Sequence, residues 1–97
     1  DGDAKLIYPP AISTSSSITV NYLPATVTFS AFGGTSFWSS IEGKLTIYLP
    51  GGNTELNLSA QSSNTSSTFY TFQGTGTFAY KMEIVNYIGN NTYLSIE

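Results

Sequence analysis

The side chains that most often perform chemistry in proteins are nearly absent from this sequence. It has no His, Cys or Arg, so the usual general base, the thiolate nucleophile, the soft metal ligands and the guanidinium clamp for phosphate are all missing. Three Lys and six Asp or Glu give a net charge of −3. We therefore expect no catalytic residue, no metal site and no cofactor.

Two catalytic arrangements remain conceivable with these residues. A Ser–Lys dyad performs acyl transfer without His, and Ser40 with Lys44 has the closest spacing. Glycoside hydrolysis needs two carboxyl groups across a cleft, which Glu42, Glu55 and Glu83 could supply in pairs. Both patterns are common by chance in strands, where such side chains are usually solvated, and we expect no enzyme.

Lysine and acidic side chains could also form a covalent or ionic link. Lys81 and Glu83 share one face of an expected strand, so they are candidates for an isopeptide bond to an Asn of a neighbouring strand. That reaction needs a neutral, desolvated Lys, and an ordinary solvent-facing ion pair is the simpler interpretation. The segment Asp1-Gly2-Asp3 resembles the start of a calcium loop, but the closing Glu does not follow.

The composition predicts one small, uncharged, all-β domain. The chain has 97 residues, of which 14 are Ser and 13 are Thr, while charged residues make up 9% against roughly 25% in an average soluble protein. Three scattered Lys cannot neutralise a phosphate backbone, which excludes nucleic acid as a partner. No apolar run is long enough to span a bilayer.

Alternating apolar and polar residues predict strands along most of the chain, and we expect no helix longer than one turn. Each alternating set would give one buried and one solvated face. The sets are Ile18, Val20 and Tyr22; Val27, Phe29 and Ala31; Leu45, Ile47 and Leu49; Leu56, Leu58 and Ala60; and Phe78, Tyr80, Met82 and Ile84. Further strands are expected over residues 69–72 and 93–96.

Turn residues separate these sets at the spacing of an antiparallel sandwich, with Gly pairs and Gly-Asn segments between strands. The polar residues 61–67 are expected to form a loop outside the sheets. We predict an immunoglobulin-like sandwich of two antiparallel sheets with about seven strands, and a jelly roll is the alternative.

The first ten residues differ from the rest and suggest a second unit. Residues 1–10 are predicted to be an extended tail, and residues 11–97 the β-sandwich head. Pro9-Pro10 favours a stiff, extended chain and prevents a tight hairpin. An extended segment of this kind can complete the sheet of another molecule, and the candidate donor residues are Ala4, Lys5, Leu6, Ile7 and Tyr8. An ordinary first strand in its own sheet, or a frayed terminus, is the alternative.

Three Asn-X-Ser/Thr triplets, at Asn57, Asn64 and Asn90, could accept N-linked glycans on an exported protein. Asn64 and Asn90 lie in expected loops, and Asn57 alternates with Leu56 and Leu58, so all three should face solvent. A start at Asp1 is what a mature protein shows after a signal peptide is removed. We therefore expect an extracellular protein at the cell surface.

These features together resemble one family. The charge-poor, hydroxyl- and aromatic-rich β composition, the sequons and the extended leader are similar to the thread-type pilins of archaeal surface filaments. The resemblance implies an incomplete immunoglobulin-like head that accepts the N-terminal strand of the next subunit, as in bacterial chaperone-usher pilins, and a glycosylated filament. The absence of a cysteine pair counts against the bacterial branch.

We therefore expect a structural subunit that polymerises head to tail through its N-terminal strand, with copies of itself and N-linked glycans as partners. A secreted carbohydrate-binding module is the alternative, since Trp38, Tyr48, Tyr70 or Tyr87 could stack on sugars. Trp38 could equally fill the core. A viral capsid or fibre protein has the same composition.

Overall fold

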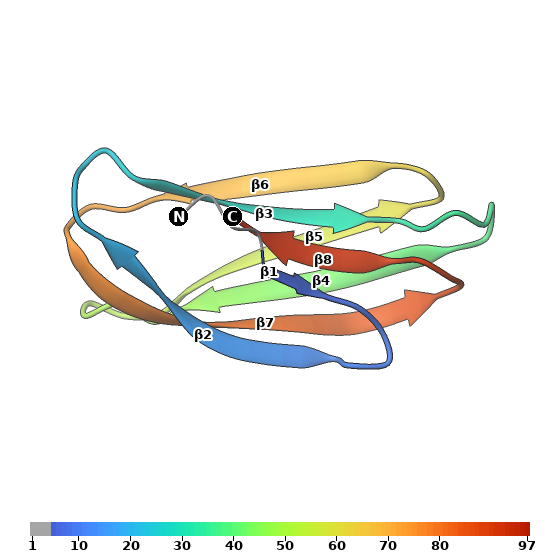
Figure 1. The fold of residues 1–97 in the computed structure, drawn as a ribbon, viewed down its shortest axis with the longest axis horizontal. Coiled ribbons are helices and arrows are strands. Elements are labelled where there is room, and N and C mark those ends of the chain that lie inside the picture. Colours follow the sequence, from blue (N-terminus) through green and yellow to red (C-terminus); the bar gives the residue numbers. More distant parts are fainter. Residues whose placement is uncertain (1–4) are drawn as a thin grey trace.

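Two antiparallel four-stranded sheets pack face to face in the computed structural model, which describes residues 5–97 (Figure 1). One sheet has the order β1-β8-β3-β6 and the other the order β2-β7-β4-β5. The strands are β1 (Lys5–Ile7), β2 (Ser13–Val20), β3 (Thr26–Phe32), β4 (Ser40–Ile47), β5 (Thr54–Gln61), β6 (Thr65–Thr71), β7 (Gly76–Ile88) and β8 (Tyr93–Ile96). The predicted two-sheet β-sandwich is confirmed, and the described residues contain no helix.

Almost every connection crosses from one sheet to the other, because only the β4–β5 hairpin joins neighbours within a sheet. The loops therefore gather at the two ends of a body that measures 41 × 19 × 19 Å. We call the end with loops 33–39, 62–64 and 89–92 the tip end, and the end with loops 21–25, 48–53 and 72–75 the base end. In Figure 1 the tip end is on the right and the base end on the left.

A single layer of apolar side chains fills the space between the sheets. Phe29, Leu45, Ile47, Met82 and Leu94 are completely buried in it. All but Leu94, which lies in the strand expected over residues 93–96, belong to the alternating sets that the sequence shows, so burial follows the period of two that a half-buried strand requires. The hydroxyl residues between them face outward, and several pair across strands, as the Ser30 and Ser67 hydroxyls do at 2.8 Å.

Two strand boundaries differ from those expected. Residues 61–67 do not form a long loop, because β5 continues to Gln61 and β6 begins at Thr65, which leaves only Ser62–Asn64 as a turn. Cross-strand hydroxyl pairs let such Ser- and Thr-rich segments join a sheet without apolar anchors. Conversely, β2 ends at Val20, and Tyr22 is 83% exposed in the loop that follows.

Gly43 of β4 lies directly against a side chain of the opposite sheet. At Gly43 the register of β4 against β7 shifts by a bulge, and a Cβ atom added there would lie 2.5 Å from Cδ2 of Leu94 in the opposite sheet. Leu94 is fully buried, so it has no free space to move into. β4 and Leu94 of β8 can therefore pack this closely only with glycine at position 43.

Replacing this glycine should loosen the sandwich. We expect Gly43→Ala to lower the free energy of unfolding by about 1–3 kcal/mol, because the extra methyl group overpacks the core. Urea denaturation measures this. Gly51→Ala is the matched control, since nothing lies within 4 Å of its Cβ position, and its midpoint should stay close to that of the unchanged chain. Equal midpoints for both variants would contradict the close approach of the sheets.

Tyr80 is the one described residue with a clearly displaced pKa. Burial raises the pKa of its phenol above the ordinary value of 10.0, and a hydrogen bond with Ser16 lowers it in part. The neutral phenol is thus favoured in the folded state, and ionisation is easier after unfolding.

Stability should consequently fall in alkaline solution. The contribution of Tyr80 is fully present below its ordinary pKa of 10.0 and is lost as the pH rises toward the higher pKa of the folded state. We expect the free energy of unfolding to decrease from about pH 9 to about pH 11, and to decrease less in Tyr80→Phe. Parallel pH profiles for the two proteins would show that Tyr80 is not the responsible group.

Candidate assembly surfaces

The N-terminal strand β1 lies at the edge of its own sheet. Lys5, Leu6 and Ile7 pair antiparallel with Ile96, Ser95 and Leu94 of β8. Ile7 is 4% exposed and belongs to the core, whereas Lys5 and Leu6 are exposed. The candidate donor residue Ala4, like the segment Asp1-Gly2-Asp3, lies outside the described residues.

This placement differs from the expected division into a free tail and a head. Lys5–Ile7 are part of the sandwich, as in the alternative that an ordinary first strand predicts. The physical reason is that Ile7 is apolar and that the outer edge of β8 would otherwise present unpaired backbone groups. The fold thus has eight strands in its described part.

The segment between β1 and β2 is weakly packed against the body. It contains Tyr8, Pro9 and Pro10, and Tyr8 is 53% exposed, although its ring centroid lies 5.3 Å from that of Tyr93. A shallow hollow of about 290 Å³ separates these residues from Tyr87 and the β7–β8 turn. Neither proline has an N–H group to bond to a neighbouring strand. β1 is therefore joined to the body by a stiff connection with few internal contacts.

The tip end presents two aromatic rings on a braced loop. Phe37 is 87% and Trp38 is 56% exposed, with ring centroids 5.2 Å apart in an edge-to-face arrangement. The sequence left open whether Trp38 fills the core, and the structure places it on the surface. Large rings exposed in this way are available for contact with a partner.

Hydrogen bonds hold this loop to both neighbouring turns. The Thr35 N–H donates to the Asn90 carbonyl, the Ser63 N–H donates to the Gly34 carbonyl, and the Ser62 N–H donates to the Ser39 carbonyl. The buried Ser39 hydroxyl lies 2.6 Å from the Gly33 carbonyl and can donate to it. The two rings are thus held on a rigid support.

Glycine is required beneath the same loop. Gly34 and Gly89 have positive φ values of 94° and 91°. A Cβ atom on Gly89 would lie 2.5 Å from the Cβ of Ser39. Only residues without side chains allow loop 33–39 and the β7–β8 turn to approach this closely.

The base end also presents apolar side chains. Tyr22 and Leu23, in the β2–β3 loop, are 83% and 47% exposed, and Tyr48 in the β4–β5 loop is 42% exposed. Of the other tyrosines proposed to stack on sugars, Tyr87 is exposed near the tip end, whereas Tyr70 packs against the core with its ring edge-to-face to Phe72.

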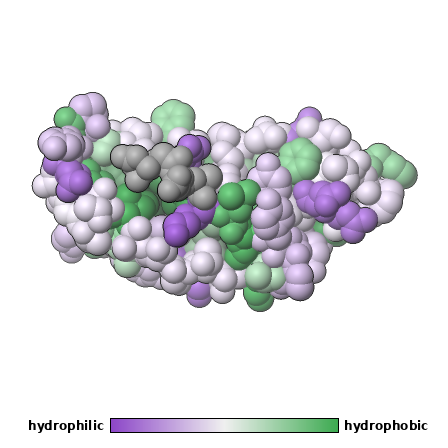
Figure 2. All heavy atoms as spheres, viewed as in Figure 1, coloured by the Kyte–Doolittle hydropathy of each residue, from purple (hydrophilic) through white to green (hydrophobic). Residues whose placement is uncertain are grey.

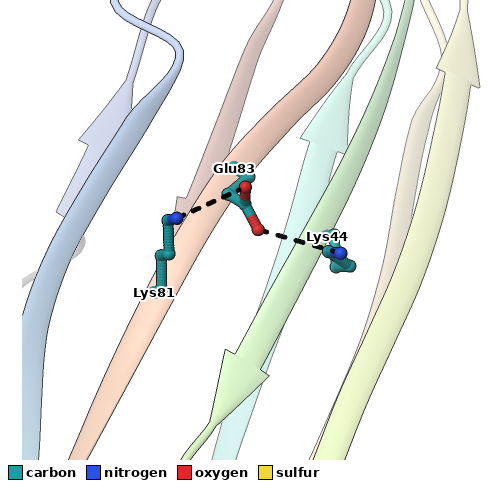
Figure 3. Close-up of polar contacts among 3 residues, drawn as sticks. All are labelled: Lys44, Lys81 and Glu83. Carbon is teal, nitrogen blue, oxygen red and sulfur yellow. Dashed lines mark ion pairs between the residues drawn. The ribbon is translucent and has the colours of Figure 1, made fainter.

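Five of the seven charged side chains among residues 5–97 lie on the outer face of the β2-β7-β4-β5 sheet. Figure 3 shows Glu83 between two lysines, with Lys81 Nζ at 3.6 Å and Lys44 Nζ at 3.9 Å from its carboxylate oxygens. All three side chains are about a third exposed or more, so the pairs contribute little to stability. Figure 2 shows, on the face in view, that strongly hydrophilic residues form separate groups.

The candidate reactive groups are not brought together. An isopeptide bond at Lys81 would need an Asn beside it, but Lys81 lies opposite Ser15 and Thr46 on the two adjacent strands. Asn57 of β5 lies opposite Lys44 instead. Ser40 and Lys44 are four residues apart on one strand, which separates them by roughly 13 Å and prevents a dyad.

The acidic side chains also fail to form a site. Glu42, Glu55 and Glu83 alternate outward on the same sheet face. Among residues 5–97 no three His, Cys, Asp or Glu side chains are grouped as metal ligands.

All three sequon asparagines are exposed. Asn57 lies on the outer face of β5, and Asn64 and Asn90 lie in the turns on either side of the tip loop, where their carbonyl groups accept the hydrogen bonds of Gly33 and Thr35. The Thr92 hydroxyl of the third triplet is buried without a hydrogen-bond partner.

Within residues 5–97, no helix has the length and apolar character needed to cross a bilayer. Comparison of the chain with protein-family models, with curated proteins and with solved structures gave no match.

Proposed function

We propose that this protein is the structural subunit of an extracellular filament at the cell surface and that it polymerises head to tail by donating its N-terminal strand to the next copy. The observation that supports this most is the attachment of β1, which has three residues, lies at a sheet edge and is followed by Pro9-Pro10. Asn57, Asn64 and Asn90 are the proposed glycan sites.

The energetic cost of releasing β1 is small. Ile7 is its only buried side chain, and burial of one such side chain contributes about 1.5–3 kcal/mol. A neighbour's strand placed on β8 restores the lost pairing and the filled pocket, so the exchange is nearly balanced. Pro9 and Pro10 form a turn between β1 and β2, in place of the extended segment expected from the sequence, so donation of β1 requires this turn to open.

The direction of the strands decides which assembly results. β1 ends at Ile7, opposite Leu94, and it runs toward the tip end before the β1–β2 connection turns back (Figure 1). A released strand therefore extends away from the tip end with its N-terminus farthest out. If it keeps its antiparallel pairing with β8, the neighbour must be turned end for end, and two copies close into a dimer.

In a head-to-tail filament all copies point the same way. The donated strand then runs parallel to the neighbour's β8. In this new register either Leu6 and Tyr8 or Lys5 and Ile7 would point into the neighbour's core. A free sheet edge can accept a strand in either direction, because its backbone donors and acceptors alternate along the edge.

A reversible lock on β1 tests strand donation. The chain has no cysteine, and Leu6 and Ser95 are register partners on one sheet face, so Leu6→Cys with Ser95→Cys should form a disulfide within one chain on oxidation. We expect the oxidised protein to form no filaments and the reduced protein to form them, as measured by light scattering and negative-stain microscopy.

The matched control is Ser30→Cys with Ser67→Cys, which would link β3 to β6 on the same face without restraining β1. This protein should assemble in both redox states. Filament growth by the oxidised Leu6/Ser95 protein at the unlocked rate would refute strand donation. A disulfide-linked pair of chains that grows no further would indicate reciprocal exchange and a closed dimer.

A second candidate function is carbohydrate binding, and the exposure of Trp38 favours it. Trp38 is the only tryptophan, so its fluorescence reports on this site alone. If the protein is a binding module, cellohexaose or chitohexaose should shift the emission to shorter wavelength in a saturable way. The shift should be lost in Phe37→Ser if the ring pair forms the stacking surface. Unchanged emission at millimolar concentrations of both sugars would exclude this function.

A further inference from the structure

We infer that the two ends of the sandwich form a second, heterologous contact in which the Phe37–Trp38 tip of one copy packs against the Tyr22–Leu23 loop of the next copy. This inference rests on the proposed filament function and adds an interface to it that does not involve β1. Three features of the surface support a second copy of this chain as the partner.

The exposed apolar side chains gather toward the ends. Of the twelve large hydrophobic residues that are exposed in the described part of the chain, five lie in the loops of the two ends, and Tyr87 and Ile88 are the last residues of β7. Leu6, Phe69 and Val85 lie in strands on the sides, and Tyr8 and Ile12 lie in the β1–β2 connection. A monomer in water would not need to place its aromatic rings at both poles, whereas a stacked subunit would.

Charge is distributed in the opposite way. Every charged residue among positions 5–97 lies in a strand, apart from Glu97 at the C-terminus, and none lies in a loop at either end. Identical copies with a net charge of −3 repel one another. Uncharged ends therefore let copies meet along the long axis with their charges kept on the sides.

The tip is rigid before any contact forms. Hydrogen bonds from Thr35, Ser62 and Ser63 fix loop 33–39 against its neighbours, so Phe37 and Trp38 lose little conformational freedom on binding. Aromatic anchors on a rigid support are the usual centres of protein interfaces. The base end offers Tyr22 and Leu23 as matching apolar surface.

The ends are too small to hold a filament by themselves. A cross-section of 19 × 19 Å limits the buried area to roughly 400 Å² per copy, about half that of a standard stable interface. The end contact should therefore be weak and reversible in the absence of strand exchange. In a filament it would orient the next copy before its β8 edge is filled.

The experiment uses the oxidised Leu6→Cys/Ser95→Cys protein, in which β1 cannot be donated, so that only the end contact remains. We expect sedimentation velocity to show self-association that increases with concentration. Phe37→Ser with Trp38→Ser in this background should abolish it. Phe69→Ser is the matched control, because Phe69 is 66% exposed on a side of the sandwich, and it should associate as before.

Mixing two variants tests which surfaces meet. Both variants are made in the oxidised Leu6→Cys/Ser95→Cys background. The tip variant Phe37→Ser/Trp38→Ser and the base variant Tyr22→Ser/Leu23→Ser should each be monomeric alone. Their mixture should form dimers and nothing larger, because each copy retains one intact end. Dimers of the base variant alone would show a tip-to-tip contact and overturn the inference. Equal association of the tip variant and the Phe69→Ser control would overturn it as well.

The outcome is separable from the test of strand donation. If donation is wrong but the end contact exists, the locked protein associates and the tip variant does not. If the end contact is absent but donation occurs, the locked protein stays monomeric at every concentration, and the reduced tip variant forms filaments as readily as the reduced Phe69→Ser protein.

Discussion

The close approach of the two sheets is the constraint on which the rest of this structure depends. With a single layer of apolar side chains between them, and with Gly43 directly against Leu94, the sandwich is only 19 Å wide for a length of 41 Å. Because six of the seven connections cross between sheets, nearly every loop must lie at one of the two ends. A thin body with all its loops at the poles leaves long sides made of strands, and those sides are solvated mainly by Ser, Thr and the few charged residues.

The period of two in the sequence was sufficient to predict the sandwich and most of its core, because the buried side chains of β3, β5 and β7, and Leu45 and Ile47 of β4, belong to the alternating apolar sets. The buried Ile41 of β4 belongs to none of them. It failed where alternation alone does not decide the outcome. Tyr22 continues the apolar alternation of β2 yet lies in a loop, and Thr65–Thr71 form a strand although their apolar residues are few. In both cases cross-strand pairing, which depends on residues far away in the sequence, determined the strand boundary.

The functional surfaces were predictable only in part, for a related reason. The sequons were expected to be exposed and are exposed, since loops and outward strand positions can be recognised locally. The position of β1 could not be decided, because a three-residue strand gains almost all its stability from the edge it joins. The exposure of Trp38 was equally undecidable from sequence, as it depends on hydrogen bonds between loop 33–39 and turns about 25 and 55 residues later in the chain.

The weak attachment of β1 and the small area of the ends are complementary properties for a polymer. An end contact limited by a narrow cross-section cannot hold two copies together for long, and a short strand cannot find a distant β8 edge without being brought near it. Once the ends meet, however, strand pairing becomes an event within one complex, with an effective concentration far above that of free subunits. Two contacts that are each insufficient can then stabilise the same junction, while an isolated subunit keeps β1 on its own sheet and exposes no unpaired β8 edge.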